Sequence, residues 1–328
     1  GQSLNEPDWF HIKPHEIVKD FANPKMKEAL EKELFSNDYD VVQYEYLQMA
    51  YLINIVKKYN TASVFTEIEV QSRKLWRDML HASFLEKLDY FYRWMVMVNF
   101  ENSICSRFDA VVALTKEDAR YIQQYNPKLD VRTSPMGIDI SFFLPHSMQA
   151  ERQSLLFVGY FRHPPNVDAM IHFSKDILPL IRKKYPDVKL YIVGGEIPRE
   201  IQQLSFDNNV VVTGWVDDLR PYYEKATIFI APIRLGAGMR GKILEAWAMK
   251  KPIVSSSVAA EGYHCENGRE IFIADEPTMF ADAVIQLLGD ERLREKIAEN
   301  GYLRARSEYA WSKIAQQYEE LYYHLLNS

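Results

Sequence analysis

Residues 231–249 read APIRLGAGMRGKILEAWAM, and the rest of the chain is best interpreted from this segment. The apolar run 226–230 before it is typical of a buried parallel strand. An apolar pattern with helical spacing begins at Ile243. Between the two lies a loop with three glycines, Gly236, Gly238 and Gly241. A strand, a glycine loop and a helix in this order predict an anion site, because glycines allow close backbone approach and a helix start offers free N–H groups.

Two cations stand at the start of the predicted helix, Arg240 and Lys242. Cations there oppose the helix dipole, so a helix selected for stability alone would avoid them. A phosphate ligand removes the conflict. Solvated surface charges are the alternative, but the neighbouring glycines favour a ligand. Glu245 lies one turn further on, where it can accept sugar hydroxyls; a capping or salt-bridge role is its alternative.

Composition limits the class of protein. With 328 residues, the chain is long enough for two domains. The net charge of -6 argues against a general nucleic-acid binder. Two cysteines, Cys105 and Cys265, provide neither a disulfide framework nor a CxxC metal site, so we expect a reducing, cytoplasmic setting. The sequence contains no apolar run of transmembrane length.

Predicted strands alternate with helices, which indicates an α/β fold with mostly parallel sheets. We expect an N-terminal domain at 1–145, a C-terminal domain at 146–310, and a last helix, 311–328, that packs back on the N-terminal domain. Because nothing in residues 1–37 has the pattern of an opening strand, the first domain is expected to lack its first βα units. The predicted strands are 40–44, 62–67, 109–114, 131–134, 155–158, 189–193, 210–213, 227–231, 252–255 and 270–274.

Two other segments carry predictions that the structure can test. Residues 159–168 are predicted as a loop before a helix at 169–185. Residues 71–106 are predicted as a long helical region that is dense in aromatic side chains. We interpret these aromatics as core or domain interface; the alternative is contact with an acceptor or with the inner face of a membrane.

Several segments in this order and spacing resemble the group 1 (family 4-like) retaining glycosyltransferases of the GT-B type, which have two Rossmann-like domains. The resemblance covers most of residues 38–326 and is strongest at 155–275. The segments that carry it are FVG 157–159, HPPNVDA 163–169, VGG 193–195, VTGWV 212–216, the opening segment up to Ala246, KPIV 251–254, AEG 260–262, FDAVVALT 108–115 and SPMGID 134–139.

The resemblance implies metal-independent transfer of a sugar, with retention, from a nucleotide-diphosphate donor to a glycan or glycoconjugate acceptor, without a cofactor. It implies that Glu245 binds the ribose and that Arg240 and Lys242 neutralise the leaving diphosphate. The other residues that it places at the donor are Gly159, Arg162, Asn166, Trp215, Val216, Gly236, Ala237, Gly238, Met239 and Glu261. For Glu261, capping of a turn is an equal alternative.

The sequence departs from the family pattern at two places. Ala237 stands where a first glutamate often precedes Glu245, and Ile68 stands where a histidine is often found. These departures, together with the missing first units, leave open a non-catalytic nucleotide-sugar-binding or partner subunit. A sugar-nucleotide epimerase on the same fold is a second alternative. The nucleobase, the sugar, the acceptor and the oligomeric state are also open.

Overall fold

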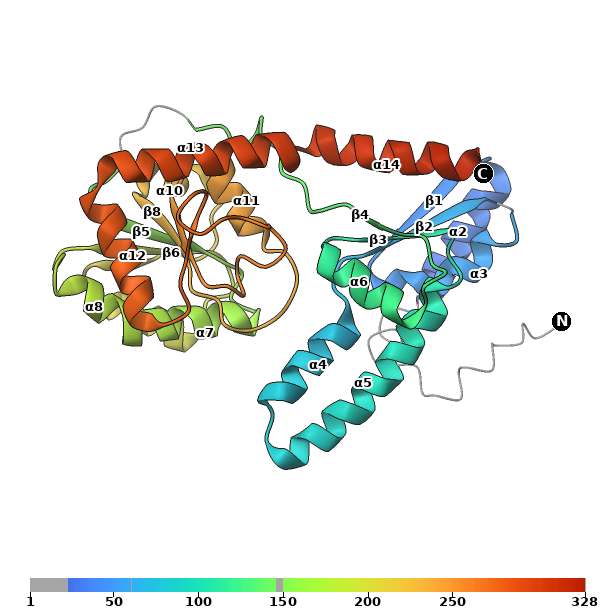
Figure 1. Ribbon diagram of the computed structural model, residues 1–328, viewed down its shortest axis with the longest axis horizontal. Helices are drawn as coiled ribbons and strands as arrows, with labels where there is room; N and C mark the ends of the chain where they lie inside the picture. The colour runs from blue at the N-terminus through green and yellow to red at the C-terminus, as the bar shows by residue number, and fades with distance from the viewer. Residues whose placement is uncertain (1–22, 60, 146–149, 328) are drawn as a thin grey trace. The chain divides into compact units, whose positions relative to one another are not determined.

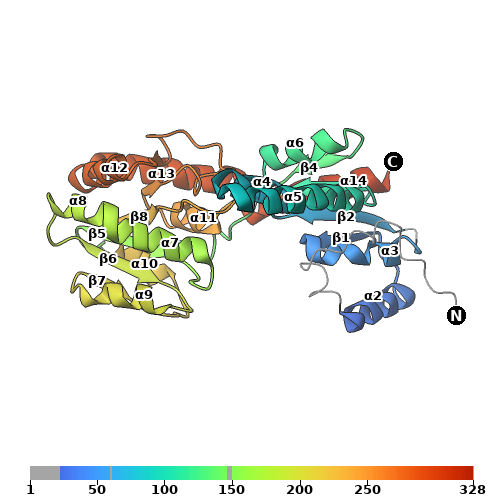
Figure 2. The same ribbon diagram turned by 90° about the horizontal axis from the view of Figure 1, so that it is seen from below.

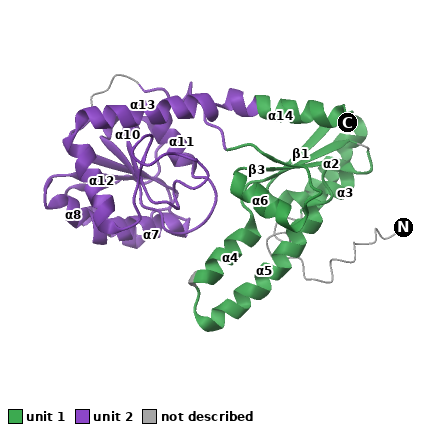
Figure 3. Cartoon of the chain, in the orientation of Figure 1, with its two compact units in different colours: residues 1–135, 316–328 green, residues 136–315 purple. Residues whose placement is uncertain are grey.

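A computed structural model describes residues 23–59, 61–145 and 150–327 (Figure 1). The chain divides into two compact units (Figure 3). Unit 1 comprises residues 1–135 and 316–328, and unit 2 comprises residues 136–315. The divisions therefore fall after Pro135 and after Ala315, whereas the sequence had suggested 145 and 310.

Unit 1 contains a parallel sheet with the order β1-β2-β3-β4. Alternate residues of its strands face opposite sides: Phe65 and Val111 lie in the main core, while Val64 and Val112 contact Leu321 of the last helix. The sheet is therefore covered on both faces. The strands are β1 (Val41–Glu45), β2 (Ala62–Glu67), β3 (Ala110–Ala113) and β4 (Val131–Thr133). The helices are α2 (Pro24–Ser36), η2 (Leu47–Leu52), α3 (Ile53–Val56), α4 (Gln71–His81), α5 (Phe84–Cys105), α6 (Lys116–Tyr125) and α14 (Trp311–Leu326).

The helical region predicted at 71–106 is confirmed, but it consists of two helices with a break between them. The chain turns at Ala82–Ser83, and α4 and α5 pack side by side as a helical hairpin (Figures 1 and 2). Ser83 and Glu86 form a capping box that starts α5. The S-x-x-E spacing of a capping box is present in the sequence and is the signal that could have revealed the break.

Unit 2 contains a parallel sheet with the order β10-β9-β8-β5-β6-β7. Its first strand, β5, lies between β8 and β6, so the strand order reverses there. Ligands of open α/β sheets bind at such a reversal, outside the carboxyl ends of the strands. The strands are β5 (Ser154–Val158), β6 (Lys189–Val193), β7 (Val210–Val212), β8 (Ile228–Ala231), β9 (Ile253–Ser255) and β10 (Phe272–Ile273).

The helices of unit 2 include one that begins earlier than predicted. Residues 159–168 are not all loop, because α7 begins at Pro164, directly after the N-cap His163. Proline suits the first helical position, where its missing N–H costs nothing. Asn166 therefore lies on the first turn of a helix. The helices are α7 (Pro164–His172), the π-helical turn η3 (Phe173–Ile177), α8 (Leu178–Arg182), α9 (Arg199–Gln202), η4 (Gln203–Phe206), α10 (Arg220–Lys225), α11 (Gly241–Ala248), α12 (Pro277–Gly289) and α13 (Glu291–Glu308).

The two unit sheets and their helices agree with the predicted α/β class with parallel sheets in two domains. Within the ranges that the structure describes, no helix combines the length and the apolar content needed to cross a bilayer.

Candidate functional site

The loop between β8 and α11 is tightly folded around its glycines. Gly236 and Gly238 have φ angles of +93° and +81°, which residues with a side chain rarely adopt. A Cβ atom on Gly236 would lie 2.7 Å from Nη2 of Arg240. The Arg240 side chain therefore folds back over the loop, and its Nη2 donates a hydrogen bond to the carbonyl of Leu235 at 3.2 Å.

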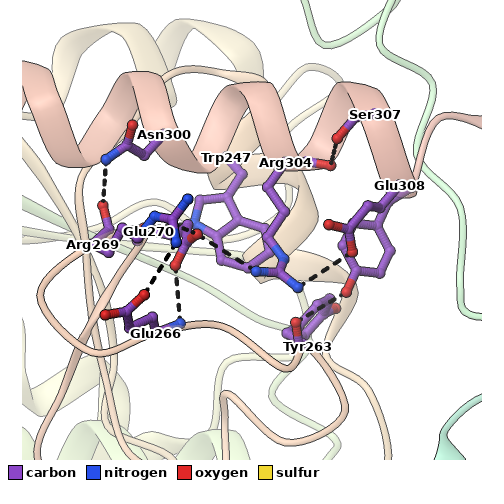
Figure 4. A network of polar contacts seen from close by, with 10 residues as sticks. Trp247, Tyr263, Glu266, Arg269, Glu270, Asn300, Arg304, Ser307 and Glu308 are labelled. Atoms are coloured by element: carbon purple, nitrogen blue, oxygen red, sulfur yellow. Dashed lines mark hydrogen bonds and ion pairs between the residues drawn. The ribbon is translucent and has the colours of Figure 1, made fainter.

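A polar network around Trp247 fixes the position of helix α11 (Figure 4). Trp247 is fully buried, and its Nε1 donates to the carbonyl of Glu270 at 3.0 Å. A Cβ atom on Gly301 of α13 would lie 2.2 Å from the Trp247 ring, so only glycine fits there. Arg304 reaches the Glu270 carboxylate at 3.5 Å. The start of α11 is fixed as well, since the Tyr263 hydroxyl donates to the Arg240 carbonyl at 2.8 Å.

Lys242 connects the two loops that meet at the reversal of strand order. Its Nζ donates to Oδ1 of Asn166 at 2.8 Å and lies 4.2 Å from the centre of the Phe157 ring. Nδ2 of Asn166 in turn donates to the carbonyl of Tyr160 at 2.8 Å. The first turn of α11, after β8, is thus joined to the first turn of α7, after β5.

The pKa of Lys242 is well below the ordinary value for lysine. Burial and, to a smaller extent, the positive charge of Arg240 lower the pKa of its ammonium group to about 7, while Glu245 acts in the opposite direction. At neutral pH the group is therefore close to half protonated. A bound anion would favour the charged form and raise this pKa.

Glu245 lies one turn beyond Lys242. Its Oε2 accepts a hydrogen bond from the hydroxyl of the fully buried Tyr223 at 2.8 Å. Burial raises the pKa of Glu245, and the Tyr223 hydrogen bond and the Lys242 charge partly offset that effect. The carboxylate is therefore held in a fixed direction and has little contact with water.

The carboxyl ends of β5 and β6 approach each other through glycines. Gly194 has a φ of +146°, and a Cβ atom there would lie 1.7 Å from the carbonyl oxygen of Gly159. Gly195 follows and lies between the aromatic side chains of Tyr160 and Trp215. Trp215 is 75% exposed, so this edge of the sheet presents a flat aromatic surface to solvent. Val216, next to it, is half-buried.

The remaining predicted residues have less defined places. Ala237 and Met239 bury their side chains in the loop before α11. Arg162 is exposed in the loop after β5, and no contact described for it reaches α11. Glu261 is half-buried in the turn after β9, two residues before Tyr263. The roles assigned to all the predicted site residues stay predictions.

Sequence reasoning missed two partners of predicted residues, Tyr223 beside Glu245 and Phe157 beside Lys242, and one ion pair near them. In the ion pair, Arg234 contacts both carboxylate oxygens of Asp168, at 2.6 and 3.1 Å. It joins the loop before α11 to α7 a second time. If the start of α7 had been predicted at Pro164, Asp168 would have been expected in the second turn of that helix, near the predicted site.

A cavity of about 560 Å³ lies at the opposite edge of the unit 2 sheet, at the amino ends of the strands. Its two lysines already have partners. Nζ of Lys251 donates to the carbonyls of Glu224 and Ala226, and Lys250 pairs with Glu299 at 2.8 Å. We therefore favour the carboxyl ends as the functional edge. Among the described residues, no group of three or more His, Cys, Asp or Glu side chains is arranged to hold a metal ion.

Comparison with known proteins finds similarity to glycosyltransferases. The family described as glycosyl transferases, group 1, matches residues 152–290. An uncharacterized 44.6 kDa protein in the cps region of Klebsiella pneumoniae is 25% identical over 293 residues, which cover 83% of this chain and 72% of that protein. The capsular polysaccharide biosynthesis glycosyltransferase CapM of Staphylococcus aureus is 27% identical over 47% of this chain, which spans 43% of CapM.

Solved structures share the fold. Sucrose-phosphate synthase from Thermosynechococcus elongatus superimposes with a TM-score of 0.75 at 18% identity, over 95% of this chain and 79% of that one. Anabaena HepE, solved in complex with UDP and glucose, superimposes with a TM-score of 0.66 at 16% identity, over 90% of this chain and 79% of that one.

Proposed function

Because this chain belongs to the group 1 glycosyltransferases with the GT-B fold, we propose that it transfers a glycosyl group from a nucleoside-diphosphate sugar to a glycan or glycoconjugate acceptor. The observation that carries the proposal is the Lys242–Asn166 contact at the start of α11, where the strand order reverses. We include retention of configuration and independence from metal because the segments that resemble the family resemble its retaining, metal-independent members.

The proposed task of the α11 start is to stabilise the leaving diphosphate. As the sugar departs, negative charge grows on the diphosphate, and a preorganised cation with free helix N–H groups lowers the free energy of that state. Lys242 supplies the cation, and Arg240 adds charge from the preceding residue. Since the diphosphate raises the pKa of Lys242, this lysine becomes fully charged only when donor is bound.

Glu245 and Trp215 are the proposed recognition groups for the nucleoside. Tyr223 occupies Oε2 of Glu245, so we assign Oε1 to the ribose hydroxyls. Trp215, exposed at the carboxyl end of β7, offers a face on which a base can stack. Because stacking tolerates every base, neither residue selects one; the HepE complex with UDP makes UDP the first nucleotide to test.

The biological setting is proposed from the named relatives. They include a capsular polysaccharide glycosyltransferase and a lipopolysaccharide core glycosyltransferase of Rhizobium meliloti, LpsE. We propose a role in the assembly of a surface polysaccharide, in the cytoplasm and at the inner face of the membrane.

Calorimetric titration with UDP, GDP, TDP and ADP tests the donor site, followed by assays of donor hydrolysis and transfer. We expect one nucleotide to bind, and Lys242→Met and Glu245→Gln each to weaken its binding. Lys250→Met is the matched control, because Lys250 lies just beyond the other end of α11 and pairs with Glu299. Absence of binding by all four nucleotides would refute the proposal. Binding without hydrolysis or transfer would indicate a non-catalytic donor-binding subunit.

A further inference from the structure

Unit 1 contains a small cavity where α4 begins and α5 ends. These two helix ends lie beside the sheet of unit 1 (Figure 1). The cavity has a volume of about 20 Å³, which is room for one occupant of the size of a water molecule. The polar side chains that line it include Glu67 at the end of β2, Ser72 in the first turn of α4, and Glu101 and Asn102 on α5.

Two oxygen atoms at this cavity lack a hydrogen-bond donor. Glu67 is 2% exposed, and its Oε2 atom has no hydrogen-bond partner among the described residues. The Oδ1 atom of Asn102 is also buried and has none among them. Nearly all buried polar atoms of folded proteins have a partner, and cavities that stay dry are lined by apolar groups. Two such acceptors at one cavity therefore indicate an occupant from outside the chain.

The cavity also has an excess of negative charge. Glu101 is buried and accepts hydrogen bonds only from neutral groups of Ser72: the backbone N–H, at 3.2 Å from Oε1, and the hydroxyl. The carboxylate of Asp118 nearby is already paired with Arg73 at 2.6 Å. No ion pair within the described ranges includes Glu67 or Glu101. Two carboxylates are thus buried without a counter-charge, which is unfavourable.

Either a retained proton or a bound cation can reduce this excess. Burial and the charge of Glu101 raise the pKa of Glu67 well above its ordinary range, so the site attracts positive charge of either kind. A proton on Glu67 can be donated to one acceptor only, and it does not fill the cavity. A cation interacts with all the oxygen atoms around it at once. The cavity and its two unpartnered acceptors therefore favour a cation.

We propose that this cavity binds one K⁺ ion through Glu67, Glu101 and Asn102. Carboxylate and amide oxygens are ligands of hard cations, and carbonyl oxygens can replace the water shell of K⁺. K⁺ is close to a water molecule in size, as the cavity requires. Ca²⁺ takes about six to eight oxygen ligands and Mg²⁺ usually keeps several waters, for which the cavity is too small. No third acidic, histidine or cysteine ligand joins these residues in the described part of the chain.

The ion has a structural task in unit 1. It joins the end of β2 to α5, and Glu101 extends the connection to α4 through the N–H of Ser72. Helix α4 receives no hydrogen bond from the side chain of its N-cap residue, Val70, so Glu101 is an acceptor that its first turn needs. The inference does not rest on the proposed function, because the cavity lies in unit 1 and the α11 site in unit 2.

Thermal unfolding of the full chain in KCl and in choline chloride of equal concentration tests the inference. Choline is too large for the cavity and keeps the ionic strength constant. A ligand that binds only the folded state raises the unfolding temperature. At about pH 8 and about a hundred times the Kd of the ion, we expect K⁺ to raise it by about 5 °C or more over choline. At about pH 5 the difference should disappear, because protons then neutralise the carboxylates.

Two variants assign the effect to the cavity. Glu67→Gln keeps the shape of the side chain and removes its charge, so it should unfold at the same temperature in both salts. The matched control is Glu31→Gln, because Glu31 belongs to unit 1 and forms a surface ion pair with Lys58 at 3.4 Å. It should keep the full difference between KCl and choline chloride.

Crystals of the wild type grown in RbCl provide a measurement that does not depend on the folding of a variant. Rb⁺ replaces K⁺ and scatters anomalously, so we expect an anomalous peak between Glu67 and Asn102. Equal unfolding temperatures of the wild type in both salts would overturn the inference and assign a retained proton to Glu67. A difference that persists in Glu67→Gln, or crystals without a peak in the cavity, would overturn it as well.

Discussion

The low pKa of Lys242 predicts that nucleoside-diphosphate binding weakens as pH rises above neutrality. In the free protein this pKa is about 7. A bound diphosphate should return it to the ordinary lysine range, about 10.4. The ammonium is then half present at pH 7 and nearly absent at pH 9 in the free protein, yet still charged in the complex. Binding at pH 9 must therefore include protonation of Lys242.

The size of the effect follows from these two pKa values. Between pH 7 and pH 9 the Kd should rise about fifty-fold, equivalent to about 2.3 kcal/mol. The ligand itself should act weakly in the other direction, because its terminal phosphate ionises near pH 6 and completes its ionisation just above pH 7. Lys242→Met should bind at least about tenfold more weakly at pH 7, because hydrogen bonds to charged groups contribute about 1.5–3 kcal/mol.

Isothermal titration calorimetry at pH 7, 8 and 9, in buffers of different ionisation enthalpy, measures both Kd and proton uptake. Wild type should take up close to one proton per nucleotide at pH 9, and Lys242→Met should take up none. Lys250→Met should behave like wild type, because its ammonium pairs with Glu299. A wild-type Kd that is constant from pH 7 to pH 9, or a slope that persists in Lys242→Met, would refute the reasoning.

Three further predictions concern other parts of the molecule. Gly301→Ala should destabilise the protein by about 1–3 kcal/mol despite the higher helix propensity of alanine, because its Cβ would lie 2.2 Å from the Trp247 ring; thermal unfolding that is unchanged or improved would contradict this. Tyr223→Phe should weaken nucleotide binding without changing the pH dependence assigned to Lys242, since it removes the hydrogen bond that orients Glu245; calorimetry at pH 7 and 9 checks both parts. Burial raises the pKa of Glu101 in unit 1 to about 7, above its value in the unfolded chain, so the folded state retains a proton that the unfolded state has lost. Stability should therefore fall as pH rises from about 4.5 to about 7, and urea unfolding of Glu101→Gln should show a smaller fall; an equal fall would rule out this carboxyl group as the source.

The sequence predicted elements where local signals agree. Helix α14, Trp311–Leu326, begins at the predicted residue, because the apolar spacing of a helix face starts there. Strands β2 and β6 also match, since their residues are β-branched or apolar and buried. The prediction failed at 159–168, where two prolines were interpreted as loop although proline is favourable at a helix start.

The contacts of the site depend on information that no local pattern contains. Lys242 and Asn166 are far apart in the chain and meet only because β5 lies beside β8 in the sheet. Tyr223 of α10 and Glu245 of α11 likewise belong to different elements. The glycine loop and its charged residues could be predicted, because all of them lie in one short segment of sequence. Their partners could not be predicted, because these come from other elements and the sequence does not give the order of the strands.

The packing of α14 on the sheet of unit 1 has a consequence for synthesis on the ribosome. Val64, Ala110 and Val112 belong to strands made early, but Leu321, which covers them, is made after all of unit 2. Domains usually fold in the order in which they emerge. Here unit 2 has its full set of residues first, while one face of the earlier sheet stays uncovered until residues 316–327 emerge. A nascent chain that pauses before this point would expose a patch of apolar strand, which is a natural substrate for chaperones.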